Sequence, residues 1–163
     1  MDFQLSPDLM EMKKSIRDFI DNVVDPLAGQ IDRDDHIPEH IMKMTQDIGL
    51  FGLSIPAEYG GTGIDMVGKC GIYEEIGRTS NGYTTVIGAH TGIGTVGIVD
   101  MGTEEQKRRY LPGMASGDII GAFALTEPSA GSNAVALKTT AVRKGDKYIL
   151  NGSKHYITNA SIA

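Results

Sequence analysis

The sequence predicts an α+β protein in which a helical domain, residues 1–117, is followed by a strand-rich domain, residues 118–163. Two observations support this division. Apolar residues recur at helical spacing through the first two thirds of the chain, and after Gly117 short apolar runs alternate with turn signals. Because the helices precede the strands instead of alternating with them, an α+β fold is favoured over βαβ units. We therefore expect a domain boundary near residues 113–118.

The first two helices are predicted from their capping residues and apolar stripes. Ser6 is a good N-cap and Pro7 suits the first helical position, so a helix is expected until Pro26 interrupts it. Its apolar stripe consists of Leu9, Met12, Ile16, Phe19, Ile20 and Val23. A second helix is expected to begin at Pro38 and end at Gly49, with Ile41, Met44 and Ile48 on one face.

A third helix is expected after the glycine-rich loop that ends near residue 64. Asp65 caps this helix, which extends through Thr79, and Glu74 and Arg78 are spaced to pair on its outer face. Glu74 and Glu75 are adjacent and point to different faces, so they make a poor acid–base pair. We expect both to be solvated or capping charges.

The last predicted helix is short. Thr103 and Gln106 have the spacing of a capping box, and Pro112 is expected to close the helix that they begin.

The strand-rich region is predicted from short apolar runs and turn residues. Strands are expected at residues 119–125, 137–143 and 148–150. Lys144-Gly145-Asp146 is a turn signal, and Asn151-Gly152 is a hairpin turn of the type that needs positive φ angles.

Composition excludes some classes of function. The formal charge of −6 argues against a nucleic-acid surface, because phosphate binding needs a basic face. The single cysteine, Cys70, cannot form an internal disulfide, and its helical spacing from Met66 and Tyr73 predicts a buried structural thiol. The first residues lack a basic segment followed by an apolar run, and no apolar stretch reaches membrane-spanning length. We therefore expect a soluble cytoplasmic protein with no membrane partner.

Residues 123–132, Phe-Ala-Leu-Thr-Glu-Pro-Ser-Ala-Gly-Ser, run from an apolar segment into a turn of small and hydroxyl-bearing residues. Such a turn can present consecutive backbone N–H groups to a phosphate or a ring carbonyl. The alternative is an ordinary strand that ends in a Pro/Ser/Gly turn, and local composition alone favours that alternative.

A second glycine-rich motif competes with this one. Gly92, Gly94 and Gly97 satisfy the dinucleotide fingerprint G-x-G-x-x-G, which would predict a nicotinamide-dependent oxidoreductase. However, the acidic residue expected about 20 positions later is absent, and Gly102 leaves almost no room for a crossover helix. The glycines from Gly88 to Gly97 fit better as a close-packed helix face or as a lining that leaves room for a ligand.

A second segment adds to the first. Thr126-Glu127-Pro128-Ser129-Ala130-Gly131-Ser132 is followed by Asn151-Gly152-Ser153-Lys154 and Tyr156-Ile157-Thr158-Asn159. Together these segments resemble the paired flavin-binding signature of the acyl-CoA dehydrogenase family. The resemblance continues upstream through residues 56–61, 73–77, 102–107 and 110–112, so it covers nearly the whole chain. The family usually has an acidic residue where this chain has Asn133.

The resemblance implies a fold, a reaction and partners. The fold is an amino-terminal helical domain followed by the first strands of a β-barrel-like middle domain. The reaction is FAD-dependent oxidation of an acyl-CoA thioester to the trans-2-enoyl-CoA in fatty-acid β-oxidation. Electrons pass to an electron-transferring flavoprotein, and the parent enzyme is a homotetramer. A non-catalytic fragment that binds acyl-CoA or flavin is the other reading of this polypeptide.

The resemblance also assigns the site. Thr126 would meet the flavin pyrimidine edge, Ser132 the pyrophosphate and the substrate, and Tyr156 the ring, while Thr158 would hydrogen-bond near flavin N5. The full set of expected flavin contacts is Phe123, Ala124, Leu125, Thr126, Gly131, Ser132, Tyr156, Ile157 and Thr158, and His90 joins Ser132 as an expected substrate contact. In this family the catalytic base is a glutamate of a carboxy-terminal domain, so no catalytic residue is expected here and the chain alone should be inactive. Glu127 is expected to order the cofactor loop.

Overall fold

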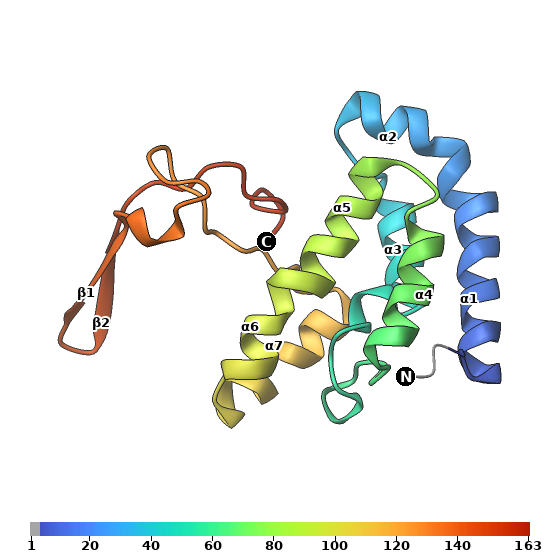
Figure 1. The fold of residues 1–163 in the computed structure, drawn as a ribbon, viewed down its shortest axis with the longest axis horizontal. Coiled ribbons are helices and arrows are strands. Elements are labelled where there is room, and N and C mark those ends of the chain that lie inside the picture. Colours follow the sequence, from blue (N-terminus) through green and yellow to red (C-terminus); the bar gives the residue numbers. More distant parts are fainter. Residues whose placement is uncertain (1–3) are drawn as a thin grey trace.

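The computed structural model describes residues 4–163, which form a helical body and an extended carboxy-terminal arm (Figure 1). The helices of the body are α1 (Pro7–Phe19), α2 (Ala28–Asp34), α3 (Glu39–Asp47), α4 (Met66–Ile76), α5 (Asn81–Ala89), α6 (Thr95–Met101) and α7 (Glu104–Ser116). Short 3₁₀ and π turns connect them: η1 (Ile20–Val24), η2 (Asp25–Leu27), η3 (Leu50–Gly52), η4 (Ala57–Tyr59) and η5 (His90–Gly94). The arm holds η6 (Ala134–Ala136), β1 (Thr140–Lys144) and β2 (Lys147–Asn151). Within residues 4–163, no helix has the length and apolar character needed to cross a membrane.

The predicted amino-terminal caps are confirmed. The Ser6 side chain accepts from the Leu9 amide, and the Asp65 side chain accepts from the Gly68 amide. At α7, Thr103 and Gln106 form both hydrogen bonds of a capping box. These local bonds satisfy backbone N–H groups that a helix leaves unpaired at its start, which is why the sequence alone could locate them.

The end of α7 differs from the prediction. Pro112 lies inside the helix, which continues to Ser116 and is closed by Gly117 at φ 80°. Proline removes one backbone hydrogen bond and usually ends or kinks a helix. Here Leu111 directly before the proline and Met114 and Ala115 after it are buried in the core, and this burial keeps the helix intact past the proline.

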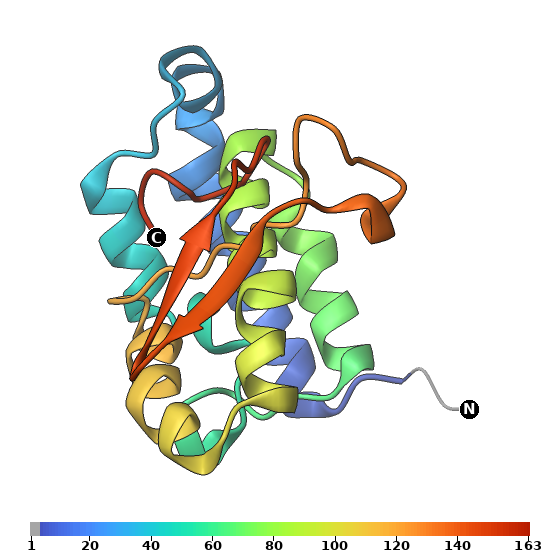
Figure 2. The same cartoon turned by 90° about the vertical axis from the view of Figure 1, so that its left-hand side faces the viewer.

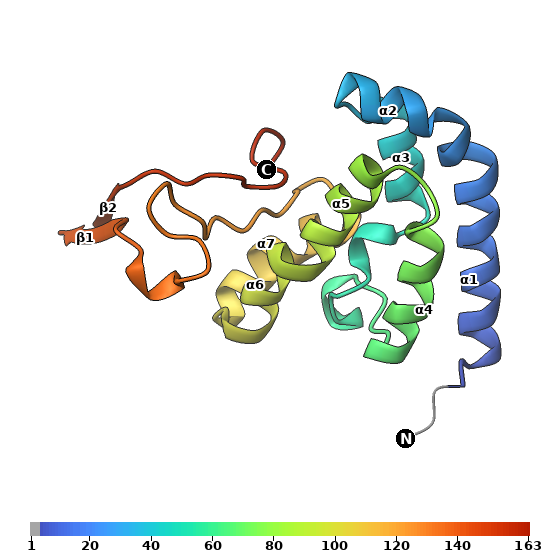
Figure 3. The same ribbon diagram turned by 45° about the horizontal axis from the view of Figure 1, so that its top comes forward.

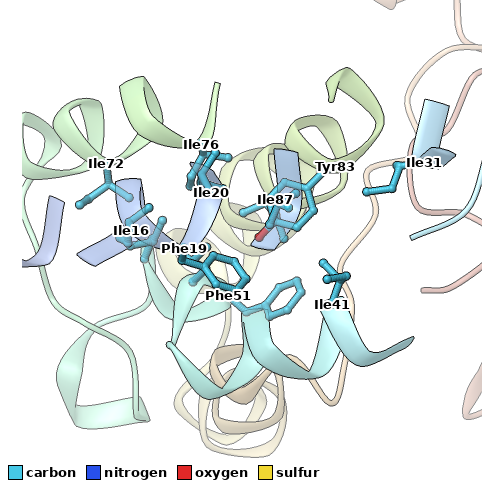
Figure 4. Close-up of a cluster of buried hydrophobic side chains, with 13 residues drawn as sticks. Ile16, Phe19, Ile20, Ile31, Ile41, Phe51, Ile72, Ile76, Tyr83 and Ile87 are labelled. Atoms are coloured by element: carbon cyan, nitrogen blue, oxygen red, sulfur yellow. The ribbon is translucent and has the colours of Figure 1, made fainter. Parts of the chain in front are cut away.

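The core lies between α1, α4 and α5 on one side and the segment from α3 to η3 on the other (Figure 4). Ile20, Ile76 and Ile87 are fully buried, and Phe51 packs beneath them. Tyr83 is also buried, and burial raises the pKa of its phenol to about 12. Because the Thr45 hydroxyl donates to the Ile41 carbonyl, the Tyr83 hydroxyl is the donor in its own 2.9 Å bond to Thr45.

Charged groups on α4 depart from expectation. Glu74 pairs with Lys13 instead of Arg78, and Arg78 contacts Asp21. Glu75 is not a solvated charge: its side chain is 2% exposed and receives two hydrogen bonds from Arg17, of 2.7 and 2.8 Å. Packing of α1 against α4 brings Lys13 and Arg17 to the Glu75 carboxylate, and helical spacing within α4 could not reveal this contact.

The prediction of a buried Cys70 is also wrong. Its thiol is exposed, because the buried face of α4 runs through Gly68, Gly71, Ile72 and Ile76 instead.

The two strands form an antiparallel hairpin that stands apart from the helices. The register pairs Thr140 with Asn151 and Lys144 with Lys147, so the turn falls at Gly145 and Asp146, as Lys144-Gly145-Asp146 predicted. The predicted turn at Asn151-Gly152 is wrong, because Asn151 is the last residue of β2. Figure 2 shows the hairpin in front of α5 and α6, and Figure 3 shows it at the opposite end of the molecule from α1.

Residues 119–125 are extended but form no ladder within the described chain. They are tied to the helical body instead: the Ile119 amide donates to the Gly113 carbonyl, and the Gln46 side chain donates to the Gly117 carbonyl. The strand predicted here is therefore an unpaired connector between α7 and the Thr126 turn.

Candidate functional site

The two predicted flavin segments lie side by side. The His155 amide donates to the Thr126 carbonyl at 2.9 Å, and the Lys154 ammonium donates to the Leu125 carbonyl at 2.9 Å. Lys154 also pairs with Glu127 at 2.9 Å. These bonds join residues that lie almost thirty positions apart in the sequence.

Glu127 orders the turn that carries the first motif, as expected. Its carboxylate accepts from the amides of Lys138 at 2.7 Å and Thr139 at 2.9 Å, in addition to Lys154, and the residue is 5% exposed. Hydrogen bonds from Thr139 and Lys138, with the Lys154 ammonium, lower the pKa of the Glu127 carboxyl to about 2. A carboxylate held so firmly in its charged form is a weak base.

The turn itself leaves open space. Glu127 and Ala130 exchange two backbone hydrogen bonds, of 3.0 and 3.1 Å, which close the turn. Gly131 and Ser132 then lie exposed, and a Cβ placed on Gly131 would meet no atom within 4 Å. A bulky anionic group could therefore approach the backbone here without displacing protein atoms.

Tyr156 has an unusual conformation for a large side chain. Its φ is 56°, in the left-handed region, and the residue is 92% exposed. The nearest ring is that of His155, edge-on at 5.7 Å between centroids. Strained backbone at an exposed aromatic residue is typical of a functional position, because folding alone does not reward it.

The remaining predicted flavin contacts divide into two groups. Phe123, Ala124 and Leu125 are exposed along the connector, and Thr126 is half-buried. Ile157 and Thr158 are half-buried and line a cleft of about 920 Å³ that Val86 on α5 also lines. The printed contacts between the two segments are those at Leu125 and Thr126, while Gly131 and Ser132 follow on the exposed side of the Glu127 turn.

His90 is placed differently from the other predicted site residues. It is fully buried in η5, where its Nε2 lies 3.0 Å from the Met114 carbonyl and its Nδ1 accepts from the Gly121 amide at 2.8 Å. Burial lowers the pKa of the imidazole. A carbonyl can only accept and an amide N–H can only donate, so the ring is the neutral tautomer with its proton on Nε2. Both polar atoms are engaged by the backbone, and neither is free for a substrate.

The Gly92–Gly97 fingerprint lies within a continuous helical run, from α5 through η5 to α6. A dinucleotide fingerprint needs a turn between a strand and a helix, so the nicotinamide alternative is wrong. The outer face of this run is open: a Cβ on Gly88, Gly92 or Gly97 would meet nothing within 4 Å. Ile93 and Val96 are exposed on the same run.

Sequence reasoning missed one residue of the site. Asn159 is buried, and its side-chain amide donates to the Val86 carbonyl at 3.1 Å and to the Gly121 carbonyl at 3.2 Å. Its φ of 69° is one that asparagine tolerates better than most residues. The only available signal was its position at the end of Tyr156-Ile157-Thr158-Asn159.

Two models of known protein domains match the chain. Residues 6–118 match the model of the acyl-CoA dehydrogenase N-terminal domain, and residues 122–163 match the model of the acyl-CoA dehydrogenase middle domain. The chain belongs to the acyl-CoA dehydrogenase family. The predicted fold class, a helical domain followed by the first strands of the middle domain, is confirmed.

Three similar proteins illustrate the relationship. An acyl-CoA dehydrogenase of Bacillus subtilis (strain 168) is 44% identical over 152 residues, which are 93% of this chain and 40% of that protein. A chain in the structure of the electron transferring flavoprotein of Acidaminococcus fermentans is 39% identical, with a TM-score of 0.92 over 100% of this chain and 43% of that chain. An acyl-CoA dehydrogenase of Bacillus anthracis complexed with FAD is 39% identical, with a TM-score of 0.86 over 97% of this chain and 28% of that chain. This chain therefore spans less than half the length of these relatives.

Acyl-CoA dehydrogenases use FAD, and the residues of this site fit that cofactor. An exposed tyrosine, an exposed apolar connector and half-buried Thr126 and Thr158 suit a flat ring with polar edges. The uncovered turn at Gly131 and Ser132 suits a pyrophosphate.

Proposed function

We propose that these residues form the helical domain, 1–117, and the first part of the flavin-binding domain, 118–163, of an FAD-dependent acyl-CoA dehydrogenase. The observation that carries the proposal is the hydrogen bond between the His155 amide and the Thr126 carbonyl, which joins the two flavin motifs. Bound FAD supplies the electron sink for oxidation of the acyl-CoA thioester to the trans-2-enoyl-CoA.

The protein's own contribution is to bind and orient the reactants. The Thr126 hydroxyl and backbone would hold the pyrimidine edge of the flavin, and Tyr156 would cover its ring. The Thr158 hydroxyl would donate a hydrogen bond near N5, and Ser132 would hold the pyrophosphate and contact the substrate. Apolar side chains exclude water from the ring, and this exclusion lowers the local dielectric there; they belong to Phe123, Ala124, Leu125 and Ile157.

On the substrate side, we assign the acyl chain to the open face of the α5–α6 run. The absence of side chains at Gly88, Gly92 and Gly97 leaves space along this face, and exposed Ile93 and Val96 provide apolar contact. His90 lies behind this wall and holds its backbone in place. Its polar atoms do not touch the substrate in this proposal, since both are bound to the backbone.

The base that removes the α-proton lies outside these residues in our proposal. The carboxylate closest in sequence to the flavin contacts is Glu127, and its pKa of about 2 makes it unsuitable as a base. The chain alone is therefore expected to be an inactive fragment.

For the complete enzyme we propose a role in fatty-acid β-oxidation in the cytoplasm, electron transfer to an electron-transferring flavoprotein, and a homotetramer. A reducing compartment is consistent with the single cysteine.

The test uses the full-length protein that carries these residues. Anaerobic addition of acyl-CoA thioesters of several chain lengths should bleach the flavin absorbance, and mass spectrometry should detect the enoyl-CoA product. Flavin reduction by NADH but by no acyl-CoA would contradict the proposal. The 163-residue chain, assayed with an artificial electron acceptor, is the matched control and should show no turnover.

A further inference from the structure

The Gly121 peptide is held from both sides. Its amide donates to His90 Nδ1 at 2.8 Å, and its carbonyl accepts from the Asn159 side chain at 3.2 Å. His90 belongs to the helical body, whereas Asn159 ends the second flavin segment. One peptide of the connector is therefore bonded to both parts of the predicted site.

The same peptide has no room to shift toward the helices. A Cβ on Gly121 would lie 2.8 Å from the terminal methyl of Met114 and 3.0 Å from the backbone of Gly94. Two glycine backbones thus cross in direct contact, which fixes the depth of the connector against the α5–α6 run.

The two side chains are also anchored at their far ends. His90 Nε2 donates to the Met114 carbonyl of α7, and its ring packs edge-on against Phe51 at 5.2 Å. The second amide hydrogen of Asn159 goes to the Val86 carbonyl of α5. Both residues therefore transmit a fixed position from the helices to Gly121, and neither of them needs to touch a ligand to do so.

We propose that His90 and Asn159 are positioning residues that hold the connector and the Tyr156–Asn159 segment at one fixed distance from the substrate wall. The expected result is a set distance between the flavin ring and the acyl chain. The effect on the distance between flavin and acyl chain rests on the proposed function, whereas the hydrogen bonds that hold Gly121 are a property of the protein alone.

Two substitutions of His90 separate its two bonds. In His90→Asn the side-chain oxygen can take the place of Nδ1 and accept from Gly121, while the bond to Met114 is lost. In His90→Gln the amide can reach the Met114 carbonyl, while the acceptor for Gly121 is lost. Asn159→Gly removes the amide and keeps a residue that tolerates positive φ. Asn22→Ala, which removes an exposed side-chain bond to the Asp18 carbonyl on α1, is the control.

Hydrogen exchange of the Gly121 amide in the full-length protein tests the hold directly. Exchange should accelerate roughly tenfold in His90→Gln, which loses the acceptor of the Gly121 amide, and in Asn159→Gly, which loses the bonds to Gly121 and Val86. It should accelerate less in His90→Asn, which keeps that acceptor but loses the bond to Met114, and should stay near the parent rate in Asn22→Ala. Flavin dissociation constants should follow the same order, with the melting temperature of the helical domain little changed. If His90→Gln fails to fold, Asn159→Gly carries the test.

Unchanged exchange at Gly121 in both His90→Gln and Asn159→Gly would overturn the inference. Equal acceleration in His90→Asn and His90→Gln would also overturn it, because a general packing defect then explains the result. If exchange follows the predicted order but the protein reacts with no acyl-CoA, the hold on Gly121 stands and the proposed function fails.

Discussion

Replacing Gly94 by alanine should disrupt the site from a distance, whereas the same change at Gly97 should not. A Cβ on Gly94 would lie 2.9 Å from the carbonyl carbon and oxygen of Gly121 and 2.9 Å from the Ala89 carbonyl oxygen, but a Cβ on Gly97 would meet nothing within 4 Å. Ordinary contacts need about 3.5 Å or more, so in Gly94→Ala the connector must move by roughly half an ångström.

The magnitude follows from comparing the two variants. Alanine is favoured over glycine in a helix by up to about 1 kcal/mol, and this gain applies to both positions. It therefore cancels in the difference between them, which leaves the cost of overpacking against a backbone, about 1–3 kcal/mol. We expect Gly94→Ala to be less stable than Gly97→Ala by that amount.

The assay is urea unfolding followed by circular dichroism, with flavin affinity measured in parallel. Gly94→Ala should lower both the unfolding midpoint and flavin affinity. Gly97→Ala should preserve stability and flavin affinity but raise the KM for acyl-CoA, because its methyl group enters the proposed acyl path. Equal stability of the two variants would refute the close crossing of Gly94 and Gly121.

Three further predictions concern polar groups. Thr158→Val should slow flavin reduction by roughly tenfold to a hundredfold, because one hydrogen bond is lost, with little change in substrate affinity. Stopped-flow absorbance measures the rate of flavin reduction, and a rate within twofold of the parent would contradict the prediction. The folded-state pKa of Glu127, about 2, lies below its ordinary value of 4.5, so the stabilisation that its carboxylate gives to the turn is complete above pH 4.5 and is lost as the pH falls toward 2. Hydrogen exchange of the Lys138 and Thr139 amides should therefore speed up across this range. Constant protection of these amides would argue against the role of Glu127. Glu75→Gln should lower the free energy of unfolding by about 1.5–3 kcal/mol, because it weakens buried charge-assisted hydrogen bonds, whereas Glu74→Gln should change that free energy little. Equal unfolding midpoints of the two variants would show that burial of Glu75 is unimportant.

Features set by neighbours in sequence could be predicted. The caps at Ser6, Asp65 and Thr103 depend on a side chain and a backbone amide a few residues away, so their spacing is sufficient evidence. The turn at Gly145 is equally local, since it needs a residue that accepts a φ of 63°. The two flavin motifs could be recognised from their residues, but their contact through Thr126 and His155 could not, because it joins distant parts of the chain.

Features set by packing could not be predicted. The spacing of Glu74 and Arg78 suggested a surface pair, yet Lys13 on α1 pairs with Glu74 and Asp21 on η1 pairs with Arg78. His90 has polar atoms suited to a ligand, and the sequence contains no sign that two backbone groups occupy them. Only the tertiary structure shows which polar side chains remain available.

The Tyr156–Asn159 segment shows why the site depends on the helical domain. Both of its end residues have positive φ, 56° at Tyr156 and 69° at Asn159, and such a conformation costs of order 1–3 kcal/mol for a bulky residue. Tyr156 itself is exposed and makes little packing contact that could offset this cost. Three residues away, the side-chain amide of Asn159 donates two hydrogen bonds, to the Val86 and Gly121 carbonyls, and these can offset the cost. The helices therefore help to impose the backbone that turns Tyr156 outward, and a segment removed from them should relax to ordinary negative φ and lose the shape that a flavin ring requires.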